Sequence, residues 1–180
     1  MTTKIAIRAV QPDMLDTLVH LERQTYTETF GSTYQPEDLD AYLQQKKSPA
    51  ALQQELAAEG ALYYFCYHED TPAGFLKLNM HKQPDDDAHT LLPTPVMELE
   101  KIYVLAAFQG FKLGKALIQH AYAVAREHQV KTIWLGVWEF NTKARDFYER
   151  EGFERFSEHS FLVGTQRDTD WLLKKSLVDS

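Results

Sequence analysis

The stretch "FQGFKLGKAL" (residues 108–117) combines two glycines, Gly110 and Gly114, with two lysines, Lys112 and Lys115. Apolar residues continue from it at helical spacing: Leu113, Ala116, Leu117, Ala121, Val124 and Ala125. The stretch therefore predicts a glycine-containing turn that leads into a helix. The first amides of a helix lack partners and the helix dipole favours negative charge there, so the turn is suited to hold a phosphate group.

A predicted strand lies on each side of this helix. "MELEKIYVL" precedes it and "VKTIWLGVW" follows it, and both are rich in β-branched and aromatic residues. A strand, a helix and a strand in this order form a βαβ unit, so residues 97–104 and 132–138 are expected to be parallel neighbours in a sheet.

The remaining chain adds further helices and strands. A strand is expected at 4–10, and a helix from Pro12 to about Phe30. Pro36 and Pro49 each open a short helix, and Asn141 caps another that Gly152 ends. The other predicted elements are a hairpin at 62–80 joined by "EDTPAG", an exposed loop at 81–96, and strands at 157–164 and 168–176. The order predicts a mixed α/β fold in one domain, 1–180.

Composition narrows the functional classes. The chain has 180 residues, a formal net charge of −7 and a pI near 5.5, which argue against nucleic-acid binding. A secretion signal and a membrane span are not indicated, so the cytoplasm is the expected location. The one cysteine, Cys66, is expected to be a buried apolar residue, and the seven scattered histidines do not suggest a metal site.

Two common phosphate-binding motifs do not fit the opening stretch. A Walker loop needs four residues between its glycines and a hydroxyl residue after the lysine, whereas here three residues separate Gly110 from Gly114 and Ala116 follows Lys115. A dinucleotide fingerprint needs three glycines after the first strand of its unit, and the stretch has two.

A third pattern fits. "QGFKLG" (109–114) resembles the Q/R-x-x-G-x-G/A motif of the GNAT acetyltransferases, with Lys112 at the position of the motif's first glycine. "NTKARDFYEREGF" (141–153) resembles the family's N-x-x-A-x-x-F-Y-x-x-x-G-F helix at six positions. Other segments along nearly the whole chain resemble the PaiA-like polyamine acetyltransferase branch. If the Lys112 position requires a positive φ, lysine costs on the order of 1 kcal/mol there, while its charge favours phosphate.

The resemblance implies a centrally splayed mixed sheet flanked by helices, with acetyl-CoA between two parallel strands that part after Val104 and Trp138. Ile102 and Val104 would bind the pantetheine arm as an added strand does, and the amides from Gln109 to Lys115 would bind the pyrophosphate. The cofactor residues implied are Ile102, Tyr103, Val104, Gln109, Gly110, Phe111, Lys112, Leu113, Gly114, Lys115, Asn141, Ala144 and Phe147. No metal is implied.

Acetyl transfer to an amine requires control of two protons. Tyr148 is the candidate general acid; its phenol would protonate a thiolate uphill by about 2 kcal/mol, so a hydrogen bond can matter more than full transfer. Tyr148 as a packing aromatic is the alternative. Glu98 and Glu100 lie on one side of a strand and are candidates to accept the proton of the amine or to hold an ammonium; solvated strand-end charges are the alternative.

The acceptor is expected to be a small-molecule amine, with a polyamine as one candidate. Tyr26, Phe30 and Tyr34 are candidate acceptor-pocket residues, or plain core aromatics. The acidic run 85–87 is either a solvated loop or a rim that attracts polyamines. Protein amines, aminoglycosides, or a non-catalytic acyl-CoA sensor remain alternatives, and the terminal hairpin is a candidate homodimer contact.

Overall fold

A computed structural model describes residues 2–163 and 165–177, and its main feature is one seven-stranded sheet. The strand order is β1-β2-β3-β4-β5-β7-β6. All neighbours are antiparallel except β4 and β5, which are parallel, as the βαβ pattern predicts. The strands are β1 (Ile5–Ala9), β2 (Ala61–His68), β3 (Thr71–Met80), β4 (Val96–Val104), β5 (Thr132–Trp138), β6 (Glu154–Val163) and β7 (Gln166–Ser176).

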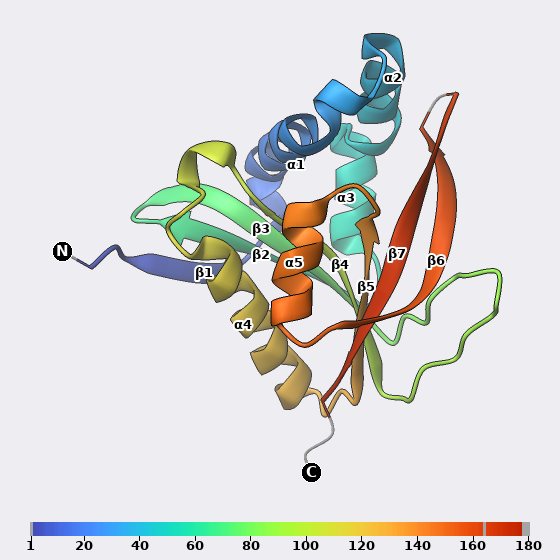
Figure 1. Cartoon of the computed structure of the whole chain (residues 1–180). Helices are drawn as coiled ribbons and strands as arrows, with labels where there is room; N and C mark the ends of the chain where they lie inside the picture. Colours follow the sequence, from blue (N-terminus) through green and yellow to red (C-terminus); the bar gives the residue numbers. More distant parts are fainter. Residues whose placement is uncertain (1, 164, 178–180) are drawn as a thin grey trace.

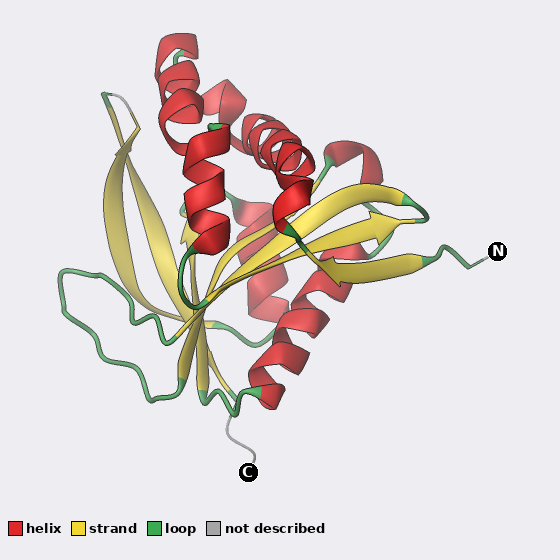
Figure 2. Cartoon of the chain, turned by 180° about the vertical axis from the view of Figure 1, so that it is seen from behind, coloured by secondary structure: helices red, strands yellow, loops and turns green. Residues whose placement is uncertain are grey.

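Helices cover both faces of this sheet (Figures 1 and 2). α1 (Leu15–Phe30), α2 (Pro36–Lys46) and α3 (Pro49–Ala57) lie on one face, and α4 (Leu113–Glu127) and α5 (Thr142–Arg150) lie on the other. Short 3-10 turns occur at Pro12–Met14, Gly31–Thr33 and Ala106–Phe108. The mixed α/β fold with a helix-flanked sheet is therefore confirmed.

The alternation of side chains along β4 separates two regions of the core. Met97 and Leu99 are fully buried against the apolar stripe of α4, which includes Leu117 and Ala121. Tyr103 points to the other face, where Phe75 and the α1 residues Leu18 and Leu21 pack together. Because β4 buries residues on both of its faces, packing on the two sides fixes its register against the neighbouring strands.

One irregularity in β4 matters for function. Lys77 pairs with Lys101 and Leu78 pairs with Leu99, so Glu100 has no partner of its own on β3. This bulge places Glu100 and Lys101 on the same face, against the usual alternation. As a result, three charged side chains, those of Glu98, Glu100 and Lys101, point toward the face covered by α1–α3.

The element boundaries that differ most from expectation are those of the hairpin turn and of β6. The hairpin turn consists of Glu69 and Asp70 alone, shorter than the predicted loop, because Glu69 adopts a positive φ of 56° that closes a tight turn. β6 begins at Glu154, three residues earlier than predicted, since it pairs with β7 from Glu154 onward. Residue 164, within the predicted strand 157–164, lies outside the described residues.

Candidate active site

The parallel strands β4 and β5 part near their start. They pair only at Val96–Thr132, Met97–Ile133 and Glu98–Trp134. The expected parting after Val104 and Trp138 is therefore wrong: it begins after Glu98. β5 stays paired with β7 over its whole length while β4 carries the bulge and stays with β3, so the two strands are drawn in different directions.

Beyond the parting, the carboxyl end of β4 forms the floor of a cavity of about 660 Å³. Its other walls come from the turn before α4, from α4 and α5, and from the end of α1. The residues lining it are Glu28, Thr29, Ile102, Tyr103, Val104, Ala106, Phe108, Gln109, Gly110, Lys112, Leu113, Gly114, Lys115, Asn141, Lys143, Ala144, Phe147, Tyr148 and Arg150. We call this cavity the cofactor cleft. The β4 edge here has no strand partner, so its backbone groups can pair with an extended ligand.

The amino end of α4 opens into the cofactor cleft. No side chain caps this helix, and its N-cap residue Lys112 has a left-handed backbone with φ 65°. The amides of the first turn are therefore available to an anion. Lysine in this conformation costs about 1–2 kcal/mol, as the departure from the motif glycine implied.

Two glycines leave room in the cleft for a ligand. A side chain added at Gly110 or Gly114 would meet no protein atom within 4 Å. Gly110 also has φ +93°, a conformation that favours glycine. Backbone can thus approach a phosphate closely at both positions, and this fits the pyrophosphate of acetyl-CoA.

Cationic side chains surround the same turn. Lys112, Lys115, Lys143 and Arg150 line the cleft, against one carboxylate, Glu28. Lys115 also pairs with Glu151 at 2.5 Å. The sequence reasoning missed Lys143 and Arg150. The helix periodicity of 142–150 could have shown that 143 and 150 are two turns apart and share a face.

All predicted cofactor residues except Phe111 come together in this cleft. Phe111 does not line it; its ring packs on His68 with centroids 4.6 Å apart. The Asn141 side chain lines the cleft while its Oδ1 accepts a hydrogen bond from the amide of Ala144 at 3.3 Å, so it also caps α5. The Gln109 amide donates to the Val104 carbonyl at 3.2 Å and ties the turn to β4.

Tyr148 lies on the α5 wall of the cofactor cleft. Its ring packs between Phe147 and Phe153 and is only 7% exposed. Burial raises the pKa of the Tyr148 phenol well above its usual range. The phenol therefore keeps its proton at physiological pH and can donate a hydrogen bond into the cleft.

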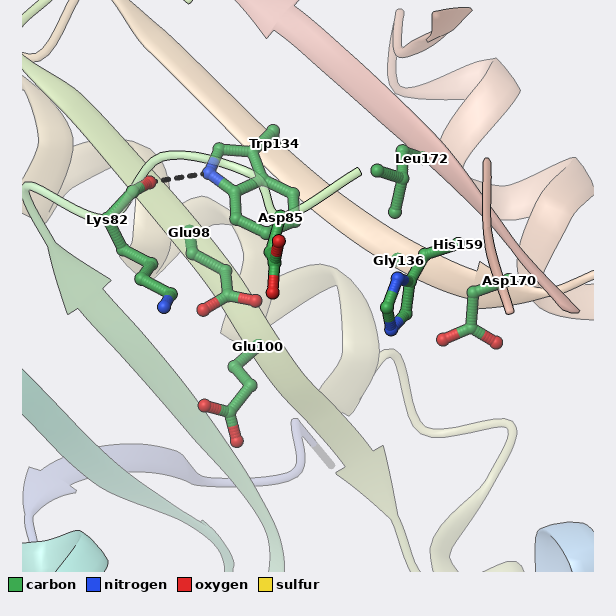
Figure 3. Close-up of a pocket in the computed structure, with 9 residues that line it drawn as sticks. All are labelled: Lys82, Asp85, Glu98, Glu100, Trp134, Gly136, His159, Asp170 and Leu172. Atoms are coloured by element: carbon green, nitrogen blue, oxygen red, sulfur yellow. Dashed lines mark hydrogen bonds between the residues drawn. The ribbon is translucent and has the colours of Figure 1, made fainter. Parts of the chain in front are cut away.

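A second cavity, of about 240 Å³, lies where β4 and β5 begin to part (Figure 3). We call it the acidic cavity because it is lined by four carboxylates. The lining residues are Lys82, Asp85, Glu98, Glu100, Trp134, Gly136, His159, Asp170 and Leu172. The indole of Trp134 donates to the carbonyl of Lys82 at 2.7 Å and holds the loop 81–95 over the strands. Glu98 and Glu100 thus face a cavity. Asp85 joins them from the loop directly before β4, and Asp170 joins them from β7, which is far away in sequence.

Glu98 and Glu100 have opposite electrostatic environments. Burial, and then the charge of Glu100, raise the pKa of Glu98. Burial alone would also raise the pKa of Glu100, but Lys101 and Lys77 outweigh it and lower that pKa. Lys77 lies 3.0 Å from Glu100 and Lys101 lies 3.7 Å from it. Of the two, Glu98 is therefore the group more ready to hold a proton.

Asp170 is a site residue that the sequence reasoning missed. Burial, and then the charge of Asp168, raise the pKa of Asp170 to about 7. Gly136 lies diagonally next to it on β5, two register positions away, and an added side-chain carbon there would lie 3.3 Å from the Asp170 carboxylate. The run of polar residues 166–170, with carboxylates two positions apart at Asp168 and Asp170, was the signal available, but nothing in the sequence indicated that β7 pairs with β5.

The acidic run 85–87 divides into different environments. Asp85 lines the acidic cavity. Asp86 is buried and accepts hydrogen bonds from the amide and hydroxyl of Thr90, at 2.8 and 2.7 Å, and from Ser157 at 2.5 Å. Asp87 is exposed. Asp86 thus orders the loop, and Asp85 is the member that faces the acidic cavity.

Tyr26, Phe30 and Tyr34 line neither cavity. Tyr26 stacks on Tyr42 with centroids 4.6 Å apart, and Phe30 packs edge-on against Trp138 at 5.6 Å. The hydroxyl of Tyr34 donates to Asp168 at 2.6 Å. These aromatics form the packing between α1, α2 and β7, and their assignment to the acceptor pocket stays a prediction.

Other chemical features can be located briefly. Cys66 is buried, and burial raises the pKa of its thiol to about 11. Among residues 2–163 and 165–177, no group of three or more His, Cys, Asp or Glu side chains is placed to share a metal ion. No helix in that part of the chain is both long and apolar enough to cross a membrane.

Known proteins share both sequence and fold with this chain. The model of the acetyltransferase (GNAT) family matches residues 15–153. An uncharacterized N-acetyltransferase in the pepI 3' region of Lactobacillus delbrueckii subsp. lactis is 38% identical over 176 residues, which cover 98% of this chain and 99% of that protein. The spermidine N(1)-acetyltransferase of Thermoplasma acidophilum is 22% identical over 154 residues, covering 83% and 88% of the two chains.

Solved structures agree on the fold. The PaiA N-acetyltransferase from Thermoplasma acidophilum, in complex with coenzyme A, has a TM-score of 0.75 at 21% identity, covering 96% of this chain and 99% of that one. The ribosomal-protein-S18-alanine N-acetyltransferase from Escherichia coli has a TM-score of 0.71 at 17% identity, covering 98% and 96%. Proteins named for different acceptors share this fold, so the fold alone does not identify the acceptor. On the family match and the full-length relative, this chain belongs to the GNAT family of acetyl-CoA-dependent acetyltransferases.

Proposed function

We propose that this enzyme transfers the acetyl group of acetyl-CoA to a primary amine of a small molecule, by direct attack with both substrates bound. The observation that carries the proposal is that successive residues of one strand, β4, line the two cavities. Ile102–Val104 lines the cofactor cleft and Glu98 and Glu100 line the acidic cavity. Residues two positions apart on a strand, such as Glu100 and Ile102, are separated by about 7 Å, so an amine and a thioester held by these segments are near neighbours.

Acetyl-CoA supplies an activated acetyl thioester. The chain's part is to bind it through the α4 amides and cations, to bind the amine in the acidic cavity, and to move protons. A primary amine with a pKa near 10.4 is neutral only about once in a thousand molecules at pH 7, so a proton acceptor is needed. Glu98 accepts that proton at its carboxylate, and Glu100, held by Lys77 and Lys101, stays ionised and attracts the ammonium form.

Tyr148 acts on the leaving side. Its phenol remains protonated and donates a hydrogen bond to the sulfur as negative charge develops there. Because burial raises the phenol pKa further above that of a thiol, this hydrogen bond contributes more than complete proton transfer.

The charge of the acidic cavity favours a substrate with more than one amine. Four carboxylates line it against one lysine, Lys82. Glu98 and Glu100 come from β4, whereas Asp170 comes from β7 on the other side of β5. A linear diamine or polyamine could place its reacting nitrogen near Glu98 and a second, charged nitrogen near Asp170. A relative named as a spermidine N(1)-acetyltransferase supports the same substrate class.

A thiol-release assay with acetyl-CoA across a panel of amines tests the activity. We expect release with 1,4-diaminobutane and spermidine, and weaker release with butylamine, which keeps the chain but loses the second charge. Binding of CoA in calorimetry with no thiol release for any amine, peptide or aminoglycoside would instead indicate an acyl-CoA sensor.

The Asp170→Asn variant tests the substrate class. It should raise KM for 1,4-diaminobutane about tenfold, because one ion pair between the second ammonium and a partly exposed carboxylate is lost. KM for butylamine, which has no second ammonium, should change less than twofold. Equal losses for the two amines would contradict the polyamine assignment and leave the transferase activity intact.

A further inference from the structure

Asn79 on β3 lies directly opposite Glu98 on β4, next to the point where β4 and β5 part. The bulge leaves Glu100 unpaired beside it. The same Asn79 nitrogen, Nδ2, donates to Glu98 at 2.7 Å and to Glu100 at 2.8 Å. One amide therefore uses both of its hydrogens to bridge two like-charged groups.

From this geometry we infer that Asn79 is a positioning residue that fixes the two carboxylates of the acidic cavity in one arrangement and keeps Glu98 able to accept a proton. The inference rests on the proposed function, in which Glu98 receives the proton of the amine. It adds a residue that does not line either cavity and acts only through Glu98 and Glu100.

The two carboxylates differ in what else holds them. Lys77 and Lys101 pair with Glu100, whereas among the described residues Asn79 is the only hydrogen-bond donor to Glu98. The second oxygen of Glu98 makes no hydrogen bond to any residue in that part of the chain, so it is available in the cavity. Loss of the Asn79 amide would thus leave Glu100 paired with its two lysines and Glu98 without a hydrogen-bond donor among the described residues.

The sign of the electrostatic effect follows from the groups around Glu98. Its hydrogen bond from Asn79 and the charges of Lys82 and Lys77 lower its pKa, against burial and the charge of Glu100, which raise it. The charged and titratable groups facing Glu98 from each neighbouring element are Glu100 of β4, Lys77 of β3, Lys82 and Asp85 of the loop, His159 of β6 and Asp170 of β7. Removing the amide takes away a lowering contribution, so Glu98 would titrate at higher pH and be protonated at pH values where the enzyme now works.

Asparagine is an unusual residue type for position 79, within β3. Asparagine is depleted in strands, and the other side chains of β3 from Phe75 to Met80 are apolar apart from Lys77. A β-branched residue would suit the strand better but could not donate to both carboxylates, and aspartate would add a third negative charge. The strand therefore accepts a poor β-former where a two-hydrogen donor is needed.

The experiment compares the wild type with Asn79→Ala and Asn79→Asp. The titration midpoint of Glu98 is measured by carbon-13 NMR of the glutamate side-chain carboxyls without acetyl-CoA or amine, with assignment by Glu98→Gln. The pH dependence of kcat/KM is measured in parallel with the best amine. In Asn79→Ala we expect the Glu98 titration midpoint and the acidic limb of the kcat/KM profile to move together to higher pH by about one unit. At pH values below the limb, this shift lowers kcat/KM about tenfold. In Asn79→Asp we expect both to move further.

Gln83→Ala is the matched control, because the Gln83 amide bonds only to the backbone of Leu92, at 2.9 and 3.0 Å, and contacts neither carboxylate. Gln83→Ala should shift neither the Glu98 midpoint nor the acidic limb by more than a small part of the shift of about one unit expected for Asn79→Ala. The inference is overturned if the Glu98 titration midpoint is unchanged in both Asn79 variants. It is also overturned if that midpoint moves while the acidic limb of kcat/KM does not.

If Asn79→Ala does not fold, the near-isosteric Asn79→Asp decides. A wild type inactive toward every amine would refute the proposed function, while the titration would still report whether Asn79 sets Glu98.

Discussion

At the scale of single residues, the two sides of the proposed reaction depend on groups whose protonation is set by burial. Tyr148 is buried among aromatic rings and keeps its proton, and Glu98 is half-buried beside another carboxylate and holds a proton more readily than an ordinary glutamate. Both shifts come from packing around the groups rather than from the residue types. Substitutions that keep the packing and remove the polar atom are therefore the informative ones.

Tyr148→Phe removes one hydroxyl and keeps the ring between Phe147 and Phe153. We expect kcat to fall about 10²-fold, because the leaving thiolate loses a hydrogen-bond donor, while the Kd for coenzyme A changes less than twofold. Tyr122→Phe is the matched control: that hydroxyl donates to Glu151 at 3.1 Å, outside the cofactor cleft. Equal kcat losses in the two variants would contradict the assignment of Tyr148.

Lys112 combines a conformational cost with a charge near the proposed phosphate site. Lys112→Gly should raise the free energy of unfolding by about 1 kcal/mol, since glycine tolerates φ 65°, and should weaken coenzyme A binding through the lost cation. Gln129→Gly provides the control, because Gln129 has a similar φ of 56° but does not line the cleft. Urea unfolding and calorimetry measure the two effects. Tighter coenzyme A binding by Lys112→Gly would show that the motif glycine matters more than the charge.

At the scale of elements, a buried charge cluster joins α1, α2 and α3 to the sheet. The Glu22 side chain of α1 is fully buried and contacts Lys47 at 2.6 Å, Lys101 at 2.8 Å and the hydroxyl of Tyr63 at 2.8 Å. Glu55 of α3 also pairs with Lys101, at 3.0 Å, and that lysine reaches toward Glu100. The helices on this face are thus docked through the same lysine that lies 3.7 Å from Glu100 of the acidic cavity.

Glu22→Gln should lower the free energy of unfolding by about 3–5 kcal/mol, because it leaves two buried lysines without their shared counter-charge. The exposed pair Arg155–Glu158, at 2.9 Å, provides the comparison: Glu158→Gln should change stability by less than about 1 kcal/mol. Denaturant unfolding of both variants tests this. A loss below 1 kcal/mol for Glu22→Gln would show that the cluster does not dock α1.

Sequence patterns predicted the elements better than the site. The helical spacing of apolar residues in 113–125 and the β-rich segments beside it predicted α4, β4, β5 and their parallel order, because burial on a sheet requires those periods. The bulge at Glu100 and the early parting of the strands were not predicted. The apolar-polar alternation of residues 97–100 does break at Glu100 and Lys101, two consecutive charged residues, but this break alone does not show where β4 leaves β5. Asp170 was missed because its place in the cavity depends on β7 pairing with β5, a contact between strands that are distant in sequence.

At the scale of the whole molecule, the parting of β4 and β5 divides the sheet into β1–β4 and β5–β7, which remain joined by three residue pairs. The cofactor cleft is lined by the last residues of β4 on one side and by α5, which follows β5, on the other. A ligand in the cleft therefore contacts both halves. Binding to a site that exists only when both halves are in place stabilises the native state by about 2.7 kcal/mol at a ligand concentration of 100 Kd.

Hydrogen exchange should show where that stabilisation acts. With saturating coenzyme A, we expect slower exchange at the first turn of α4, at the amides of residues 102–104 and in α5, because these surround the cleft, and little change in β1 and β2, which do not line it. Addition of spermidine should then protect the loop 81–95, whose Lys82 and Asp85 line the acidic cavity. Protection of that loop by coenzyme A alone, with none added by any amine, would mean that the acidic cavity is not the acceptor site. Protection in the order described would place the two substrates on the two sides of the parting, as direct attack requires.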